Sequence, residues 1–244
     1  QSKTNAVIER VTFRGGYAVD GSGLYSSNAY AQIRHAVFEN NAGPAGGYYG
    51  RGGGVYLLGG SVTLEHVILS NNRVNTLNTG WSAYGAGAYI ASGVHYFRNI
   101  LGAANHMADD GTATAALVGS FLFANGGTTT VENATLAHNS AGLTLYRNGG
   151  TLRVANSIVW DNDSGDYGGT IAFSNSCATS LTAGVQGNLN SDPLFETPLF
   201  YLATNSPCVA AGNRTVEAAG VTNRTSFTNG VTESSGTTVN LGYH

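Results

Sequence analysis

Apolar and polar residues alternate in short segments along most of this chain, and the same alternation returns several times. The segment from Val62 to Asn72 serves as a template, and it aligns without gaps with residues 31–41, 95–105, 129–139 and 152–162. A weaker copy runs over residues 6–16. Alternation with a period of two is typical of strands that bury one face. The pattern therefore predicts one strand-containing unit that is repeated along the chain.

Two columns of this alignment are apolar or β-branched. The third template position holds Ile8, Ile33, Leu64, Phe97, Val131 and Val154, and the seventh holds Thr12, Val37, Ile68, Leu101, Thr135 and Ile158. The fifth position is polar in every copy, with Arg10, His35, His66, Asn99, Asn133 and Asn156. We expect the apolar columns to point into a core shared by stacked copies, and the polar column to make structural hydrogen bonds.

The last column of the alignment is almost entirely asparagine. It begins with Gly16 and continues with Asn41, Asn72, Asn105, Asn139 and Asn162. Asparagine tolerates the left-handed backbone conformation of a tight corner, and its side-chain amide can bond to an asparagine one layer away. We therefore expect an asparagine ladder along one corner of the stack.

A second strand precedes each copy. Its aligned first residues are Leu24, Val55, Ala88, Phe121 and Leu143, which lie 17, 17, 17, 18 and 19 residues before the ladder asparagine (41−24, 72−55, 105−88, 139−121, 162−143). Variable insertions collect in one place, after the asparagine. Repeated strands whose copies bury a core only together indicate a solenoid. A β-sandwich would show strands bounded by unrelated turns.

The predicted fold is all-β: a single right-handed parallel β-helix of about six to eight coils with an irregular C-terminal cap. Residues 1–170 are assigned to the coils. Residues 171–244 are assigned to the last coil or coils and the capping segment of the same domain, because the repeat can no longer be read after about Gly169.

Composition narrows the environment and the partners. The 244 residues include 11 Lys and Arg against 14 Asp and Glu, so the net charge of −3 gives no reason to expect nucleic acid as a partner. No apolar run approaches the roughly 20 residues that a transmembrane helix needs, so we expect no membrane span. We interpret the start at Gln1 as a processed N-terminus or an excised fragment.

The chain has two cysteines, Cys177 and Cys208. A disulfide between them would stabilise the fold by ~3–4 kcal/mol in the chain-entropy model. The alternative is a pair of separate buried thiols. We expect the disulfide, because the other features favour an oxidising compartment.

Two surfaces are candidates for binding. The first is a row formed by Tyr25, Tyr56 and Tyr89, which share the outward middle position of one strand in consecutive copies and give way to Leu122 and Thr144. Exposed rings in a row could hold sugar faces or a protein, although tyrosine also simply suits an exposed strand.

The second candidate surface is a set of insertions that leave the same corner. These insertions carry Tyr48, Tyr49, Arg51, Trp81, Tyr84, His106, Asp109 and Asp110. Adjacent loops on a rigid scaffold form a natural binding edge, although exposed corners also tolerate insertions that have no role.

Catalytic chemistry has weak support. The acidic groups Asp109 with Asp110, and Asp161 with Asp163 and Asp166, are candidates for Ca²⁺ or for glycoside hydrolysis, but solvated turns explain them better. A lyase needs a base and a cation at the uronate, and Lys3 is the sole lysine. We assign no catalytic residue, no metal site and no cofactor, and keep Ca²⁺ as a secondary possibility.

The tail carries a family resemblance. It contains Asp192-Pro-Leu-Phe195, Ser206-Pro-Cys-Val-Ala-Ala-Gly212 and Val239-Asn-Leu-Gly-Tyr-His244. This series resembles the ending of bacterial surface β-helix proteins of the "choice-of-anchor" type, in which Asp is usual where Asn240 stands. The copies also resemble the repeats of polymorphic outer-membrane proteins, with Gly53-Gly-Val-Tyr56 and Phe38-Glu-Asn-Asn41 as the best matches. The resemblance implies a β-helix at an extracellular location or a cell surface.

Two functions remain open. The first is a non-catalytic surface or structural protein: an adhesin, a matrix component or a filament subunit that self-assembles. The second is a polysaccharide lyase or hydrolase, or a carbohydrate-binding β-helix module. The partners expected are further copies of the chain or surface glycans. Sequons at Asn133, Asn162, Asn213 and Asn223 are compatible with surface glycosylation, and equally with chance in an Asn-rich and Thr-rich chain.

Overall fold

A computed structural model describes residues 5–43, 50–76, 82–109, 117–196 and 200–244. In this part of the chain 17 strands belong to one large sheet whose strand pairs are parallel, and two helices of three and four residues are the only helical segments. The all-β class is thus confirmed. Parallel strands need a long connection between partners, and here each strand pairs with its counterpart in the next copy of the repeat.

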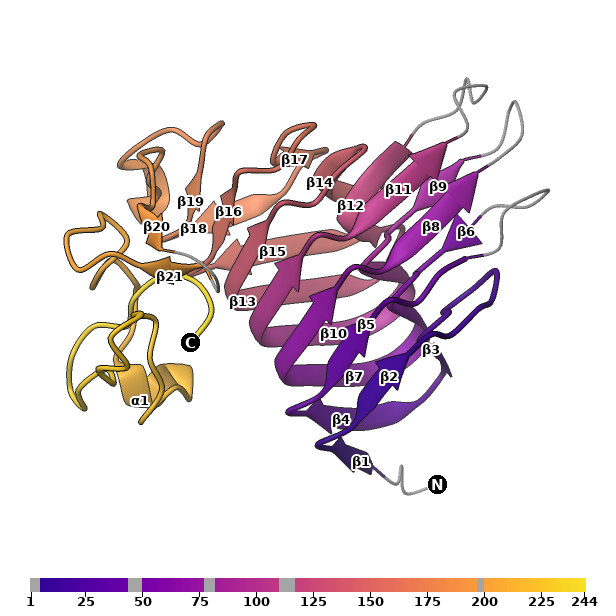
Figure 1. Ribbon diagram of the computed structural model, residues 1–244, viewed down its shortest axis with the longest axis horizontal. Helices are drawn as coiled ribbons and strands as arrows, with labels where there is room; N and C mark the ends of the chain where they lie inside the picture. The colour runs from indigo at the N-terminus through magenta and orange to yellow at the C-terminus, as the bar shows by residue number, and fades with distance from the viewer. Residues whose placement is uncertain (1–4, 44–49, 77–81, 110–116, 197–199) are drawn as a thin grey trace.

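The pairing runs along three faces of the molecule, and Figure 1 shows the strands lying side by side from the N-terminal to the C-terminal copies. Face 1 consists of β3 (Leu24–Ser27), the start of β7 (Val55–Ser70), the start of β10 (Ala88–Ala103), β12 (Leu117–Ala124), β14 (Leu143–Arg147) and β17 (Tyr167–Gly168).

Face 2 follows face 1 in each copy. It consists of β1 (Ala6–Glu9), β4 (Tyr30–Arg34), the middle of β7 and β10, β13 (Thr128–Ala137), β15 (Thr151–Ala155) and β18 (Ala172–Ser174).

Face 3 completes each copy. It consists of β2 (Thr12–Arg14), β5 (Val37–Glu39), the ends of β7, β10 and β13, β16 (Ile158–Trp160) and β19 (Cys177–Ala178). The stacking therefore continues past Gly169, where the repeat could no longer be read from the sequence.

The remaining elements are short. The corner after the ladder asparagines holds β6 (Gly50–Arg51), β8 (Arg73–Thr76), β9 (Ala83–Tyr84) and β11 (His106–Asp109). Beyond the coils lie the 3₁₀ helix η1 (Val185–Gly187), β20 (Phe195–Glu196), β21 (Tyr201–Leu202) and the helix α1 (Val216–Ala219).

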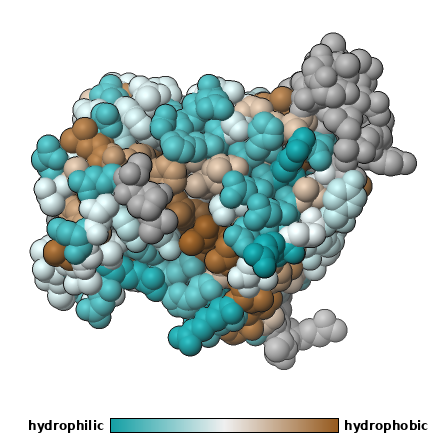
Figure 2. Space-filling model, viewed as in Figure 1, coloured by the Kyte–Doolittle hydropathy of each residue, from teal (hydrophilic) through white to brown (hydrophobic). Residues whose placement is uncertain are grey.

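The core lies between the three faces and is filled by the apolar columns of the repeat. Ile33, Leu64, Phe97, Val131 and Val154 stack in register on face 2 and are at most 1% exposed. Each copy contributes too few apolar side chains to bury a core alone, so the stack is the stable unit. On the outside, Figure 2 shows a largely hydrophilic face with a patch of apolar residues near its middle.

One correction concerns the register on face 1. Leu122, not Phe121, pairs with Ala88, and Leu145, not Leu143, pairs with Leu122. A shift between Val118 and Leu122 accommodates the change. With this register the distance to the ladder asparagine is 17 residues in these copies as well (139−122 and 162−145). Constant spacing is the signal that would have given the correct alignment.

Small residues open the strands of face 1 because neighbouring copies of the repeat approach closely there. A Cβ added to Gly54 would lie 2.5 Å from the Gly87 carbonyl oxygen of the next copy, and one added to Gly23 would lie 2.5 Å from Gly54 O. Either contact would push the two copies apart, which explains the glycine before the strand.

The C-terminal segment folds back onto the corner between faces 2 and 3 (Figure 1). The His244 N–H donates to Asn99 Oδ1 (2.8 Å), and the Asn99 amide donates to the His244 carbonyl (3.0 Å). Asn213 and Asn156 exchange a similar pair of hydrogen bonds, each 3.0 Å long. The polar fifth column of the repeat is thus the docking line for this segment.

Candidate functional site

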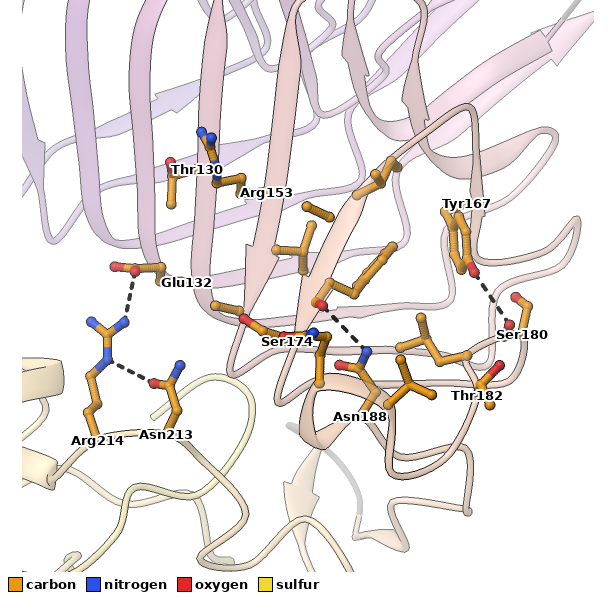
Figure 3. A pocket seen from close by; sticks show the side chains of 18 residues that line it. Thr130, Glu132, Arg153, Tyr167, Ser174, Ser180, Thr182, Asn188, Asn213 and Arg214 are labelled. Atoms are coloured by element: carbon orange, nitrogen blue, oxygen red, sulfur yellow. Dashed lines mark hydrogen bonds and ion pairs between the residues drawn. The ribbon is translucent and has the colours of Figure 1, made fainter.

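A groove crosses face 2 at its C-terminal end. It has a volume of about 660 Å³ and is open to solvent. Strands β13, β15 and β18 form its floor, residues 180–188 form one wall, and Asn213 and Arg214 form the other. Figure 3 shows the Glu132–Arg214–Asn213 chain on one side of the groove and the Tyr167–Ser180 hydrogen bond on the opposite side.

Glu132 is the one carboxylate that lines this groove among the described residues. Its Oε1 accepts a hydrogen bond from Arg214 Nη2 at 3.0 Å, and its Oε2 lies 3.6 Å from Arg98 Nε. Two guanidinium groups therefore hold this carboxylate, whose side chain is 18% exposed. Both oxygens of this carboxylate therefore already have an arginine partner.

The pairs at Glu132 belong to a column of alternating charge on face 2. The stacked residues of this column are Glu9, Arg34, Glu65, Arg98 and Glu132. Arg34 lies 3.6 Å from Glu9 and 3.1 Å from Glu65. Ala155 follows Glu132 in register and ends the alternation. Arg214, which comes from the C-terminal segment, takes the place of the missing cation.

Arg153 lies in the neighbouring column of the same face. Its strand β15 pairs it with Thr130 on one side and Ala172 on the other. The Arg153 side chain is exposed and has no ion pair or hydrogen bond with any described residue. Figure 3 shows it beside Thr130, with Glu132 turned away toward Arg214. A guanidinium offers five N–H donors, and no described residue accepts a hydrogen bond from those of Arg153.

Hydroxyl and amide groups make up most of the polar remainder of the lining. They belong to Thr130, Ser174, Ser180, Thr182, Gln186, Asn188 and Asn213. Apolar contact surface comes from the ring of Tyr167 and from the side chains of Ile171 and Val185. This mixture suits a ligand chain that is rich in hydroxyl groups and carries one or more acidic groups. Glycoside hydrolysis usually needs two carboxyl groups, and the described lining contains one, that of Glu132.

The tyrosine row forms a longer column than the sequence indicated. Ring centroids are 5.0 Å apart for Tyr25–Tyr56 and for Tyr56–Tyr89, and the column continues to Phe123 (5.4 Å) and Tyr146 (5.6 Å). The expectation that the row ends at Leu122 and Thr144 is wrong, because the register on face 1 is shifted.

The stacking also changes what the row can bind. Tyr56 and Tyr89 are 6% and 5% exposed, whereas Tyr25 at the N-terminal end is 49% exposed. Rings that stack on each other leave their edges, not their faces, for a ligand. Burial raises the pKa of both the Tyr56 and the Tyr89 phenol, so these rings stay neutral. The column forms mainly a second hydrophobic cluster, here called the seam, on the outer side of face 1.

Arg51 and Tyr84 cover this seam. The Arg51 guanidinium lies 5.3 Å from the Tyr56 ring centroid and 5.7 Å from that of Tyr89, and it forms two hydrogen bonds of 2.8 Å with Asp20. The Tyr84 ring lies 4.5 Å from that of Phe123. Five of the predicted binding residues therefore gather at face 1: Tyr25, Tyr56, Tyr89, Arg51 and Tyr84.

Three of the other predicted binding residues, Tyr48, Trp81 and Asp110, lie outside the described residues. Asp109 ends strand β11, and only its backbone is described. Of the second acidic group, Asp161 pairs with His138 (2.7 Å), and Asp166 accepts hydrogen bonds from Thr179 N (2.7 Å) and Ser180 Oγ (3.3 Å).

The ladder asparagines are joined by their side chains. The amide of Asn41 donates to Asn72 Oδ1 (2.9 Å), Asn72 to Asn105 (3.0 Å), Asn105 to Asn139 (3.0 Å), and Asn139 to Asn162 (3.1 Å). The left-handed conformation belongs to the preceding residue, not to the ladder asparagine as expected. These preceding residues are Asn40, Asn71, Ala104, His138 and Asp161, with φ between 52° and 56°. This residue turns the chain, and the turn directs the next side chain inward.

Cys177 and Cys208 are free thiols in this structure, so the expected disulfide is not formed. Both are fully buried in one small apolar cluster with Ile158, Leu202 and Leu241. A hydrogen bond between the two thiols, together with burial, raises the pKa of Cys177 far above that of a free cysteine. The two residues predicted to pair are therefore neighbours in the fold but are reduced.

The structure also bears on the expected metal ligands, membrane spans and glycosylation sites. The described residues contain no group of three or more His, Cys, Asp or Glu side chains placed to hold a metal ion. None of the described helices has the length and apolar character to cross a membrane. Of the four sequon asparagines, Asn133 is 2% exposed and Asn162 is bound within the ladder. Asn223 is exposed, and Asn213 is exposed but hydrogen-bonded to Asn156.

Sequence reasoning missed the groove, and comparisons do not supply it. No protein-family model, curated protein or solved structure matches this chain. The candidate site is therefore assigned from its own geometry. One signal was present in the sequence: Arg153 occupies a strand position where the other aligned copies have Val7, Gln32, Thr63, Tyr96 and Thr130.

Proposed function

We propose that this protein is a non-catalytic glycan-binding scaffold of an extracellular surface, either an adhesin or a matrix component. The groove on face 2 carries the proposal. It is open, about 660 Å³ in volume, and lined by hydroxyl, amide and guanidinium groups. Such groups match the hydroxyls and ring oxygens of sugars, and an open groove admits a chain better than an isolated small molecule.

The scaffold is proposed to be a closed right-handed parallel β-helix. Supporting this, each copy passes through faces 1, 2 and 3 in the same order and pairs with the next copy on all three. Connections between parallel strands of one sheet are right-handed in almost every known case. The inward columns and the asparagine ladder repeat at the same positions, as expected for stacked coils.

The contacts of Glu132 favour binding over catalysis. An inverting or retaining glycosidase uses two carboxyl groups that face one cleft. The described lining of the groove has one, and Arg98 and Arg214 both hold it. Lyase chemistry needs a base near the sugar C5 proton, and no histidine, lysine or tyrosine hydroxyl free of a partner lines the described groove.

An extracellular location is part of the same proposal. Support comes from the low content of charged residues, 10% of the chain, and from the resemblance of the tail to the endings of surface β-helix proteins. The lectin-like role explains why a rigid stack would carry a groove at one end of a face, since rigid elements position binding groups well.

The test is a glycan array probed with the whole chain, beside an assay for released reducing ends or unsaturated products. Ala172→Trp places a large ring on the exposed floor of the groove. Val7→Trp is the matched control, because Val7 is an exposed residue of the same register column at the far end of face 2, outside the groove. We expect binding without turnover, loss of binding in Ala172→Trp, and no change in Val7→Trp.

Absence of binding to any glycan would refute the proposal. Release of products that stops in Ala172→Trp would establish the alternative function, a polysaccharide hydrolase or lyase. Self-assembly into filaments, the other version of a surface role, stays a prediction that light scattering at high protein concentration tests separately.

A further inference from the structure

We infer that the groove on face 2 selects acidic polysaccharides, and that Arg153 is the residue that binds their carboxylate groups. This inference rests on the proposed glycan-binding function and adds the chemical class of the ligand. It is argued from the local charge of the groove and from the absence of a partner for Arg153 among the described residues.

The groove carries a charge opposite to that of the whole protein. Its described lining has one acidic residue, Glu132, and two basic ones, Arg153 and Arg214, which gives a net charge of +1, whereas the chain as a whole has −3. Arg98, which also contacts Glu132, adds a further positive charge next to the groove. A cationic groove on an anionic protein attracts acidic ligands to that one place.

Arg153 differs from the other arginines that point outward from face 2. Arg34 contacts Glu9 and Glu65, and Arg98 contacts Glu132, so both are neutralised by the alternating column. Arg153 stands one column away, where its register neighbours are Thr130 and Ala172. On the strand of Arg153, the position that belongs to the charge column is occupied by Ala155, which has no carboxylate. Arg153 is therefore an arginine of the groove lining whose guanidinium no described residue neutralises.

The uncharged lining points to a sugar as the carrier of the acidic group. Hydroxyls and amides from Thr130, Ser174, Thr182 and Gln186 surround the floor, and they can bond to sugar hydroxyls on either side of the guanidinium. The guanidinium fork fits a planar carboxylate through two parallel N–H···O bonds. A uronic acid residue in a chain combines both requirements.

The experiment measures binding of the whole chain to oligomers of galacturonic acid, mannuronic acid and glucuronic acid, each beside its carboxyl-reduced form. The reduced form keeps the chain and removes the charge. We expect at least one acidic oligomer to bind roughly tenfold or more tightly than its reduced form, because a charge-assisted bidentate contact has that strength.

Variants of Arg153 test whether this residue causes the preference for acidic over reduced oligomers. Arg153→Gln should abolish the preference for the acidic form, and Arg153→Lys should retain part of it. Arg73→Gln is the matched control, because Arg73 is an exposed strand arginine outside the groove and its loss changes the net charge equally. Thermal unfolding checks that all variants are folded.

The outcomes separate the two proposals. Equal binding of acidic and reduced oligomers, or a preference that survives in Arg153→Gln, overturns the inference while the glycan-binding function stands. Failure of the protein to bind any glycan overturns both.

Discussion

The guanidinium of Arg214 donates a 3.0 Å hydrogen bond to the carboxylate of Glu132, a residue 82 positions earlier in the chain. Arg214 belongs to the irregular C-terminal segment and Glu132 to the regular strand β13. The pair thus extends the charge column of face 2 across the boundary between the stacked strands and the C-terminal segment. It also fixes one wall of the groove.

Arg214→Gln should loosen this attachment. Both side chains are partly exposed, at 30% and 18%, so we expect a loss of about 1 kcal/mol or less in the free energy of unfolding. Arg14→Gln is the control, because the Arg14 side chain, which pairs with Glu39, is 68% exposed. Loss of this pair should leave the free energy of unfolding almost unchanged. Denaturant unfolding measures both. Equal effects in the two variants would show that the wall is held by other contacts.

Asn105→Ala should be far more costly. The Asn105 amide donates to Leu69 O (2.9 Å) and Asn139 Oδ1 (3.0 Å), and its oxygen accepts from the Asn72 amide (3.0 Å), all out of contact with water. Loss of these bonds leaves buried partners unsatisfied, and we expect roughly 3 kcal/mol of destabilisation. The control Asn125→Ala removes an exposed amide pair with Asn148. A cost near zero for Asn105→Ala would mean that the ladder contributes little.

The stability of the protein should fall in mild acid because of His66. Burial, followed by the charges of Arg224 and His35, lowers the pKa of His66 from 6.5 to about 4. The unfolded chain therefore takes up this proton first, and stability is lost as the pH drops from about 6.5 to about 4. Since His66 is partly exposed, screening by solvent limits the loss to on the order of 1 kcal/mol.

Unfolding free energies of His66→Asn, compared with wild type at about pH 7.5 and about pH 4.5, check this expectation. Asparagine already fills the same column at Asn99 and Asn133, so the backbone conformation at this position, with φ of 52–54°, is compatible with it. The variant should lose less stability between the two pH values than the wild type does. An identical pH dependence would assign the acid sensitivity to other groups.

The buried carboxylate of Glu233 gives a second acid-sensitive contact. Desolvation alone would raise the pKa of Glu233. The His244 imidazole, whose Nε2 lies 2.6 Å from Glu233 Oε1, and hydrogen bonds from Asn240 and Ser226 lower this pKa overall. A lowered pKa means that this contribution is present at neutral pH and is lost as the pH falls below 4.5. Glu233→Gln should therefore reduce stability at neutral pH more than in strong acid, as chemical denaturation at both conditions will show.

The thiols of Cys177 and Cys208 should resist labelling until the protein unfolds. Both are 0% exposed, and the raised pKa of Cys177 removes the reactive thiolate. Oxidation of the folded protein should join these neighbours, with a loss of two hydrogens in the intact mass and a gain of about 3 kcal/mol in stability. Cys208→Ala is the control that cannot form the bond. Rapid labelling of the native protein would contradict the burial of the pair.

The sequence by itself determined the repeated elements of this protein. The aligned segments pair in the predicted register, so that Val62 lies between Ala31 and His95. The reason is local: alternation decides which side chains face inward, and a one-residue slip would expose the whole core column. The asparagine column was equally readable, because its spacing is fixed by the coil. The error at Phe121 arose where an irregularity before Leu122 broke the alternation.

Only the tertiary structure decided what each outward residue contacts. Arg153 is visible in the sequence, but its lack of a partner in the described part of the chain depends on its neighbours. Its register neighbours are Thr130 and Ala172, and Glu132 is held by Arg214. Tyr89 was expected to be exposed and is buried, because Phe123 stacks on it and Arg51 covers it. Periodicity predicts the direction in which a side chain points. Its partners come from distant parts of the chain, up to 145 positions away in the pair Asn99–His244, which the stacking of the repeats and the return of the C-terminal segment bring together.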